Sequence, residues 1–244
     1  MSRVLPILFN TEMVKAILDE RKTATRRLIK FPENNFTGEV PQADNIKVCK
    51  NTLFAKKISF LEEPHYTFNI SPPCHLGDIL YVRETWKCWR AHRYEATVDI
   101  MYKAGGKDIR LQFANGNTDL ADRHDYDQFA YKWHGQKWHP SIHMPKEAAR
   151  IWLKATDVRA ERLQEMTASE SIKEGIRLPK QYDTKERAYI LKFADLWDSV
   201  IKKSDMDIYG WEANPWVWVI EFERCEKPEP CIRKGSSSGK GAGT

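Results

Sequence analysis

The feature that most constrains the fold is a strand-like run that follows Gly77 and Asp78. Over residues 79–86 a period of two places the odd-numbered side chains on one face of an extended strand. The even-numbered side chains, Glu84 and Trp86 among them, lie on the other face. Further strands are predicted over residues 5–9, 98–102, 129–133, 151–158 and 216–222. A chain in which strands dominate is typical of an α+β domain.

Helix signals separate the predicted strands. Asn10 is a good N-cap before an apolar helical repeat, and Thr167 with Glu170 forms a capping box. Gly175 is well placed to end the helix that this box begins. The predicted helices cover residues 11–21, 168–174 and 186–201. The sequence therefore predicts an α+β domain with a small β-barrel of five or six strands and two to three helices.

Composition divides the chain into one domain and a tail. Residues 1–226 are predicted to form a single domain. Within it, residues 32–75 are rich in Pro, Asn, Thr and Lys and show no sustained period, which indicates a loop-rich insertion. Residues 87–150 are polar and aromatic, and most of them give no clear pattern. Residues 227–244 end in a run of Gly and Ser, which predicts a flexible tail.

Charge and cysteine content limit the partners. The formal net charge of +5 permits a phosphate-bearing partner but is low for a protein that binds long nucleic acids. Five cysteines without a C-x-x-C pair argue against a disulfide framework and against a cysteine-rich zinc site. The sequence shows neither an apolar signal peptide nor a run that could span a membrane. We therefore expect a cytoplasmic protein without a membrane partner, and we leave its oligomeric state open.

Four short motifs, in order along the chain, resemble the ASCH domain, a PUA-like family. The clearest follows the first predicted helix, where residues 22–27 read K-T-A-T-R-R and are similar to the family signature G-x-K-T-x-T-x-R. Glu20 stands where the family often has glycine. The other motifs are the strand opening at residues 77–80, the helix that leads to Glu174 and Gly175, and the closing strand at residues 216–222. Further segments at residues 82–86, 140–145 and 214–216 resemble long ASCH-type proteins of phages and prophages.

The resemblance implies a PUA-like small β-barrel that acts on RNA or on a modified nucleoside. The best-defined enzymes of the wider family are N(4)-acetylcytidine amidohydrolases, which use a Lys and a Thr of the signature and a Glu of the later helix. Carried over by motif, these are Lys22, Thr25 and Glu174, our candidate catalytic residues. The candidate substrate-binding residues are Thr23, Arg26, Glu84 and Trp86.

The three catalytic candidates suit hydrolysis of an amide. A threonine hydroxyl attacks a carbonyl well only after a base takes its proton. Lys22 can be that base if burial or nearby cations lower its pKa, and Arg21, Arg26 and Arg27 are its neighbours in sequence. Glu174 could orient Lys22 or protonate the leaving amine. The alternative is a solvated basic turn, or a basic run over residues 21–30 that holds phosphate.

Two of the binding candidates also have structural interpretations. Glu84 shares its strand face with apolar residues, so it either points inward and pairs with Arg26 or Lys22, or ends the strand in water. Trp86 could stack on a base or fill the core. The same choice applies to the tryptophans at positions 89, 133 and 138.

The remaining alternatives concern metals and the class of function. His139 and His143 have a zinc-like spacing, but Pro140 intervenes and no Cys or acidic ligand lies nearby, so neither metal nor cofactor is predicted. A non-catalytic RNA-binding module is the main alternative to the amidohydrolase. A ribonuclease is the third, with Lys22 and Arg26 stabilising the cleaved phosphate.

Overall fold

The computed structural model of the chain describes residues 2–30, 67–113, 120–179 and 186–228, together with the backbone of two strands within residues 46–56. The predicted tail lies outside the described residues from residue 229 onward, and so does most of the predicted insertion. No helix in the described part of the chain is both long enough and apolar enough to cross a membrane.

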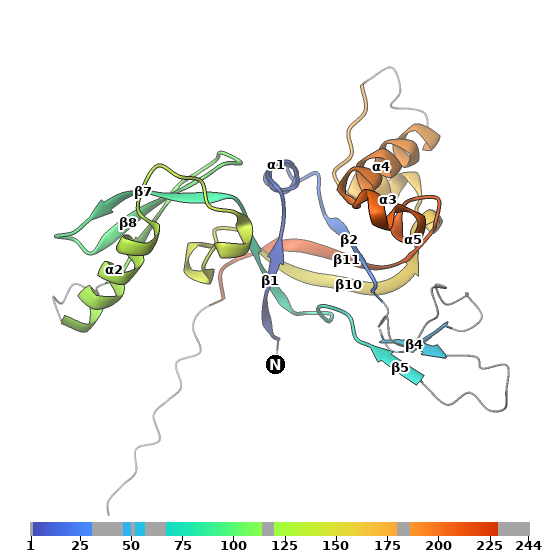
Figure 1. The fold of residues 1–244 in the computed structure, drawn as a ribbon, viewed down its shortest axis with the longest axis horizontal. Helices are drawn as coiled ribbons and strands as arrows, with labels where there is room; N and C mark the ends of the chain where they lie inside the picture. Colours follow the sequence, from blue (N-terminus) through green and yellow to red (C-terminus); the bar gives the residue numbers. More distant parts are fainter. Residues whose placement is uncertain are drawn as a thin grey trace, which may run out of the picture.

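A curved sheet of five strands forms the centre of the molecule (Figure 1). In spatial order its strands are β1 (Val4–Leu8), β6 (Ile79–Arg83), β10 (Trp152–Arg162), β11 (Trp216–Cys225) and β2 (Ala24–Leu28). Strand β1 runs parallel to β6, and the other neighbours are antiparallel. Strand β11 therefore separates β2 from β10, and the sheet joins the first strands of the chain to the last.

The sheet is open between its two edge strands, β1 and β2. The described residues show no backbone pairing between these strands, but Arg27 Nη2 of β2 donates to the Leu8 carbonyl oxygen of β1 at 2.6 Å. Pro6, two residues earlier in β1, directs its backbone to the same side as Leu8. Because proline has no N–H group, it cannot donate a hydrogen bond to β2 at this edge. We call the line between residues 6–8 and 27–28 the seam. The α+β class is confirmed, whereas the predicted closed barrel is corrected to an open sheet whose edges are bridged by a side chain.

Three helices lie at one end of β10 and β11: α3 (Ala168–Lys173), α4 (Glu186–Val200) and α5 (Met206–Tyr209) (Figure 1). Helix α1 (Thr11–Leu18) follows β1 and begins at Asn10, whose side chain accepts from Met13 N. Thr167 and Glu170 form the predicted capping box at the start of α3. The three predicted helices are confirmed. The first ends earlier than predicted because Glu20 has a φ of 58°, in the left-handed region.

A second sheet lies at the other end of the molecule. It contains β7 (Trp86–His92), β8 (Thr97–Tyr102) and β9 (Ile109–Gln112), with α2 (Leu120–Trp133) beside it (Figure 1). The predicted strand over residues 129–133 is wrong, because these residues belong to α2. Tyr126, Phe129 and Trp133 recur at helical spacing and pack into a second hydrophobic core, which includes Trp86, Val98 and Ile100. The strand predicted over residues 79–86 also ends early, at Arg83, because the chain passes from the central sheet into β7.

The remaining elements are short. The insertion contributes an antiparallel sheet of β3 (Ile46–Cys49), β4 (Thr52–Lys56) and β5 (Thr67–Ile70). Single turns of 3₁₀ helix occur at Ser141–His143, Lys146–Ala148, Leu163–Glu165 and Lys203–Asp205.

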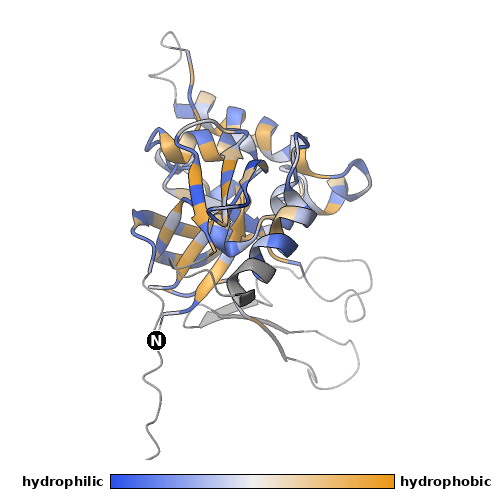
Figure 2. Ribbon diagram, turned by 90° about the vertical axis from the view of Figure 1, so that its left-hand side faces the viewer, coloured by the Kyte–Doolittle hydropathy of each residue, from blue (hydrophilic) through white to orange (hydrophobic). Residues whose placement is uncertain are grey.

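The central sheet is buried on both faces near β11. Trp218 and Ile220 belong to the main core with Phe9, whereas Val217 and Val219 pack with Phe193 of α4. Figure 2 shows apolar residues alternating with polar ones along the strands. Consecutive side chains of the central strands therefore pack into different cores on the two faces of the sheet. The face on which a candidate site residue lies determines its surroundings.

Candidate functional site

Strand β2 contains most of the motif K-T-A-T-R-R at residues 22–27 and presents its side chains to two different environments. Arg26 pairs with Val219 of β11, while Thr25 pairs with Ile220 and Arg27 pairs with Trp218. Directly opposed residues on neighbouring strands share a face of the sheet. Arg26 therefore faces α3 and α4, and Thr25 and Arg27 face the main core and the seam.

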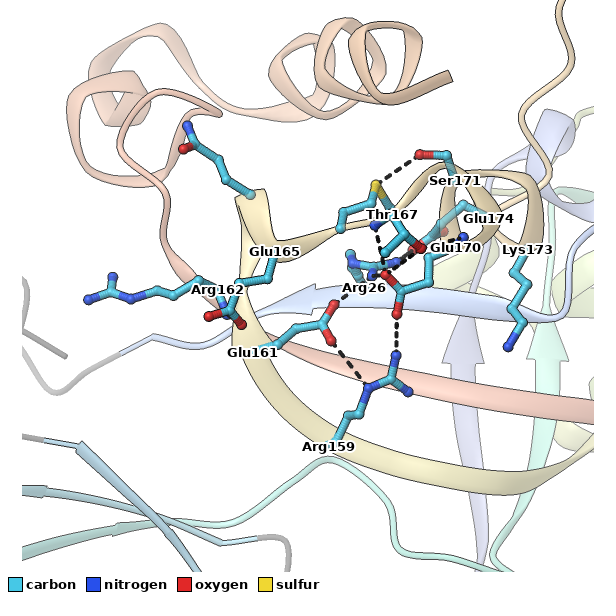
Figure 3. A network of polar contacts seen from close by, with 12 residues as sticks. Arg26, Arg159, Glu161, Arg162, Glu165, Thr167, Glu170, Ser171, Lys173 and Glu174 are labelled. Carbon is cyan, nitrogen blue, oxygen red and sulfur yellow. Dashed lines mark hydrogen bonds and ion pairs between the residues drawn. The ribbon is translucent and has the colours of Figure 1, made fainter. Parts of the chain in front are cut away.

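On the α3 side, Arg26 is surrounded by carboxylates (Figure 3). Its Nη2 lies 2.5 Å from Glu161 Oε1 and 3.4 Å from Glu170 Oε2, and its Nη1 lies 3.5 Å from Glu174 Oε1. Arg159 extends the cluster, with Nη2 2.6 Å from Glu170 Oε1 and Nε 3.2 Å from Glu161 Oε2. The Arg26 side chain is 1% exposed. We call these five residues, together with Lys22, the charge network.

Lys22 and Glu174 form a buried ion pair at the edge of this network. Lys22 Nζ lies 2.5 Å from Glu174 Oε2 and donates to the Glu174 carbonyl oxygen at 3.0 Å. The two side chains are 1% and 5% exposed. Thr23 N also donates to the Lys173 carbonyl oxygen at 2.8 Å, so the backbone fixes this contact between segments far apart in the sequence.

Gly175 allows the two segments to approach so closely. Its φ of 93° lies in the left-handed region, which a residue with a Cβ adopts at a cost. A Cβ atom at this position would lie 2.9 Å from Ala16 Cβ and 3.2 Å from Lys22 Cβ. The glycine that follows Glu174 therefore has both a conformational and a steric role in placing Glu174 against Lys22.

The environment of Lys22 lowers its pKa, so its ammonium group loses a proton more readily than that of an exposed lysine. Burial is the largest influence and lowers the pKa of Lys22, and the charges of Arg26 and Arg27 lower it further. Glu174 opposes this shift through its charge and its hydrogen bond, but the net direction is downward. A lysine with a lowered pKa can accept a proton closer to neutral pH than an exposed lysine can.

The two threonines of the K-T-A-T-R-R motif differ in position. Thr25 is buried, on the same strand face as Arg27 and opposite Ile220. The side chain of Thr23 is exposed, and its backbone joins Lys173 and Phe222. The structure thus brings Lys22, Arg26 and Glu174 together, with Thr25 on the face of β2 opposite to Arg26 and Thr23 at the surface.

Phe9 is in contact with Lys22 and also lines a cavity. Its ring centroid lies 5.7 Å from Lys22 Nζ and 5.2 Å from Arg27 Cζ. Phe9 also lines a cavity of about 410 Å³ beside the start of α1, which we call the α1 cavity. The other residues of its lining are Leu8, Asn10, Thr11, Met13, Arg27, Thr85, Pro140, Ser141 and Val200.

A second cavity of about 440 Å³ lies along the seam, and we call it the seam cavity. Leu8 and Arg27 line both cavities. The rest of the seam cavity is mainly apolar and consists of Pro6, Ile7, Leu28, Ser71, Pro73, Cys74, Leu80, Trp218 and Ile220. Both cavities have the size of a small-molecule site.

Glu84 does not pair with Arg26 or Lys22 as expected. Its buried carboxylate forms two hydrogen bonds with Arg150, from Nε to Oε1 at 2.9 Å and from Nη2 to Oε2 at 3.0 Å. Burial raises the pKa of Glu84, and Arg150 opposes the shift. The interpretation of Glu84 as an inward-pointing residue is correct, but its partner comes from the segment before β10.

Trp86 also lies away from the Lys22 pair. It is fully buried in the second core, where its ring centroid is 5.3 Å from those of Trp133 and His139. Because the chain leaves the central sheet after Arg83, Trp86 enters the core beside α2. Glu84 and Trp86, two of the candidate substrate-binding residues, therefore lie apart from Lys22, and Trp86 has the core-filling role.

The other tryptophans and the histidine pair have partners of their own. Arg90 Cζ lies 4.0 Å from the ring centroid of Trp89, and Lys87 Nζ lies 5.0 Å from that of Trp138. His139 packs edge-on against Trp133. Within the described ranges, no three His, Cys, Asp or Glu side chains are grouped so that they could hold a metal ion.

Arg27 is the residue that sequence reasoning undervalued. It was given no role of its own, yet its side chain bridges the seam and lines both cavities. Two signals were available. Arg27 stands at the arginine of the pattern K-T-x-T-x-R, and the strand period places Arg26 and Arg27 on opposite faces of β2.

Comparisons with models of known protein families, with curated proteins and with solved structures found no match.

Proposed function

We propose that this protein is an ASCH-type hydrolase that cleaves the amide bond of an acylated nucleoside, free or within RNA, with N(4)-acetylcytidine as the model substrate. The observation that carries the proposal is the contact between Lys22 and Glu174, which lie 152 residues apart and meet at 2.5 Å. The motif resemblance had already indicated Lys22 and Glu174 as catalytic residues. A chance contact between these two residues therefore explains the ion pair poorly. A buried titratable pair with a shifted pKa is typical of functional sites.

Two backbone features support the ASCH-type fold within this proposal. Glu20 adopts the left-handed conformation that glycine favours, at the position where the family often has glycine. The central sheet also curves until its edge strands are bridged by Arg27, which approaches the barrel of PUA-like domains without closing it.

In the proposed reaction Thr25 is the nucleophile and Lys22 the base. The Lys22 amine takes the hydroxyl proton as Thr25 Oγ1 bonds to the amide carbon. The carbon–nitrogen bond then breaks, and Lys22 returns the proton to the leaving exocyclic amine. Water hydrolyses the resulting threonine ester and releases the carboxylic acid. Glu174 holds the Lys22 side chain in place through both steps.

Access to Lys22 involves Phe9. The Lys22 side chain is enclosed, whereas the Phe9 ring contacts Nζ and also lines the α1 cavity. A rotation of the Phe9 ring connects the ammonium group to the cavity. We assign Phe9 the role of a gate that keeps the pair dry until substrate binds, because a dry environment maintains the lowered pKa of Lys22.

The sharpest test is the substitution Thr25→Val. Valine matches threonine in shape and lacks only the hydroxyl, so the buried position keeps its packing. We expect kcat/KM for release of cytidine from N(4)-acetylcytidine to fall by about 1,000-fold or more, while Thr25→Ser keeps measurable turnover. Product release is followed by liquid chromatography, and thermal unfolding verifies that both variants fold.

A different result would select one of the alternatives. If the wild-type protein leaves acetylated cytidine intact, both as the nucleoside and within RNA, the hydrolase proposal fails. RNA binding with a steep dependence on salt concentration would then indicate a binding module. Turnover by Thr25→Val equal to that of the wild type would remove Thr25 from the reaction.

A further inference from the structure

Arg27 is a half-buried cation without a direct counter-charge. In the described part of the chain no carboxylate lies within 4 Å of its guanidinium, whereas Arg26, one residue earlier, has three. Its contacts are the Leu8 carbonyl oxygen and the Phe9 ring. Burial lowers the pKa of Arg27, and only the charge of Glu174 opposes this. Enclosing a charge without a partner is unfavourable, so Arg27 is suited to accept an anion.

The two cavities that meet at Arg27 differ in character. The seam cavity has an apolar wall formed by Leu80, Trp218 and Ile220. The α1 cavity includes the polar side chains of Thr85 and Ser141 and the first residues of α1. A ligand that extends across Arg27 therefore meets an apolar surface on one side and hydroxyl groups on the other. This division matches a molecule with a flat apolar part, a hydroxyl-bearing part and an anion.

The surroundings of Arg27 favour phosphate as the anion. A guanidinium binds the oxygens of phosphate through two parallel hydrogen bonds, and Arg27 uses Nη2 for the Leu8 carbonyl oxygen, which leaves its other donors for a ligand. The α1 cavity also borders Asn10 and Thr11 at the positive end of α1. Backbone amides at the start of a helix add to the attraction for an anion.

We propose that the two cavities form one binding site for a nucleotide, with Arg27 as its phosphate subsite and the seam cavity as its base subsite. The identity of the ligand rests on the proposed function, whereas the anion subsite rests on Arg27 itself. Thr25 shares the strand face of Ile220, so a base in the seam cavity lies on the side of β2 that carries the nucleophile. A phosphorylated nucleoside, as a mononucleotide or as a residue of RNA, should then bind more tightly than the free nucleoside.

Calorimetric titration of the full chain with unacetylated ligands tests this inference. The ligands are cytidine, cytidine 5′-monophosphate and a dinucleotide that carries cytidine on an internal phosphodiester. We expect the phosphate to tighten binding by about 10- to 100-fold, as charge-assisted hydrogen bonds typically do. Tighter binding of the dinucleotide than of the monophosphate identifies RNA as the source of the phosphate, and the reverse order identifies a mononucleotide.

Two substitutions and one control locate the phosphate. Arg27→Gln should remove the advantage of the monophosphate over cytidine. Lys30→Gln removes the same charge from an exposed position just beyond β2 and should leave it intact. Ser71→Glu places a carboxylate on the exposed rim of the seam cavity and should weaken the monophosphate more than cytidine. Ser71→Glu keeps the test decisive if Arg27→Gln fails to fold.

The outcomes for this site and for the hydrolase are distinguishable. Equal affinity for cytidine and its monophosphate, or an advantage that persists in both Arg27→Gln and Ser71→Glu, overturns the phosphate subsite. If N(4)-acetylcytidine is hydrolysed in that case, the proposed function stands alone. If the monophosphate binds through Arg27 but no acetylated substrate is cleaved, the subsite stands and the hydrolase fails.

Discussion

The two faces of β2 place adjacent arginines in opposite situations. Arg26 lies in the charge network, enclosed and within 3.5 Å of three glutamates. Arg27 lies at the seam between two cavities, where it contacts a carbonyl oxygen and an aromatic ring. The same residue type, one position apart, is bound by the protein on one face and left open to a ligand on the other. The strand face on which a charged residue of a motif lies therefore determines whether the protein itself or a ligand can neutralise its charge.

The largest effect is expected from breaking the charge network. Arg26→Ala leaves Glu161, Glu170 and Glu174 close together without their shared cation. Removing one partner from a buried ion pair typically lowers the free energy of unfolding by about 3–5 kcal/mol. Urea unfolding measures the change. A loss below about 1 kcal/mol would mean that Arg159 and Lys22 stabilise the carboxylates without Arg26.

Acid should weaken the network face in particular. Two carboxylates on this face have pKa values below the ordinary 4.5: Glu170 of the charge network, and Glu221 of β11, which lies 2.9 Å from Arg159. Burial raises both pKa values, but Thr167 and Arg26 lower that of Glu170 further than burial raises it, and Lys173 and Arg159 do the same for Glu221. The stability that these two groups contribute is fully present above the ordinary glutamate pKa of 4.5. It is lost as pH falls through their lowered pKa values. We expect the Tm to fall by a few degrees as pH drops from 5 to 3.5.

A matched variant assigns the acid effect to the network. Asp78 and Asp99 also have lowered pKa values, so the wild-type curve contains their contributions as well. Arg159→Gln should flatten the dependence of Tm on pH, because Arg159 contacts both Glu170 and Glu221. A curve as steep as that of the wild type would place the acid sensitivity outside the network.

The smallest effect on stability is expected at Arg27. Arg27→Gln retains a hydrogen-bond donor for the seam and removes a charge without a carboxylate partner. We expect the free energy of unfolding to change by less than about 1 kcal/mol, as at positions outside buried networks. The same urea experiment provides the measurement. A loss similar to that of Arg26→Ala would make Arg27 a structural residue and remove the contrast between the two faces.

Short sequence patterns predicted the helices well, because helix caps and helical repeats involve residues close together in the chain. The helices at α1, α3 and α4 follow from caps and from helical repeats, and those patterns survive in the structure. Residues 129–133 were misread because a short aromatic run fits a strand as well as a helix. Including Tyr126 in the window reveals the helical spacing that places this segment in the second core.

The site was predictable only in part because its contacts are distant in sequence. The meeting of Lys22 and Glu174 came from motif resemblance, and no spacing within the chain could have given it. The pairing of Glu84 with Arg150 depends on where β6 ends and on the position of the segment before β10. The sequence therefore indicated that a buried Glu84 requires a partner, but it did not identify Arg150. The cavities at Arg27 depend on the open seam, which follows from the curvature of the whole sheet.

The position of β11 also affects the order in which the molecule assembles. Strand β2 is made well before its partner in the sheet, β11, which is the last strand in the described part of the chain. Until β11 has left the ribosome, β2 has no neighbour on that side. Pairing over such long sequence separations slows folding and leaves strand edges available for wrong contacts. Residues 24–28 therefore stay without their neighbour in the sheet until β11 has been made.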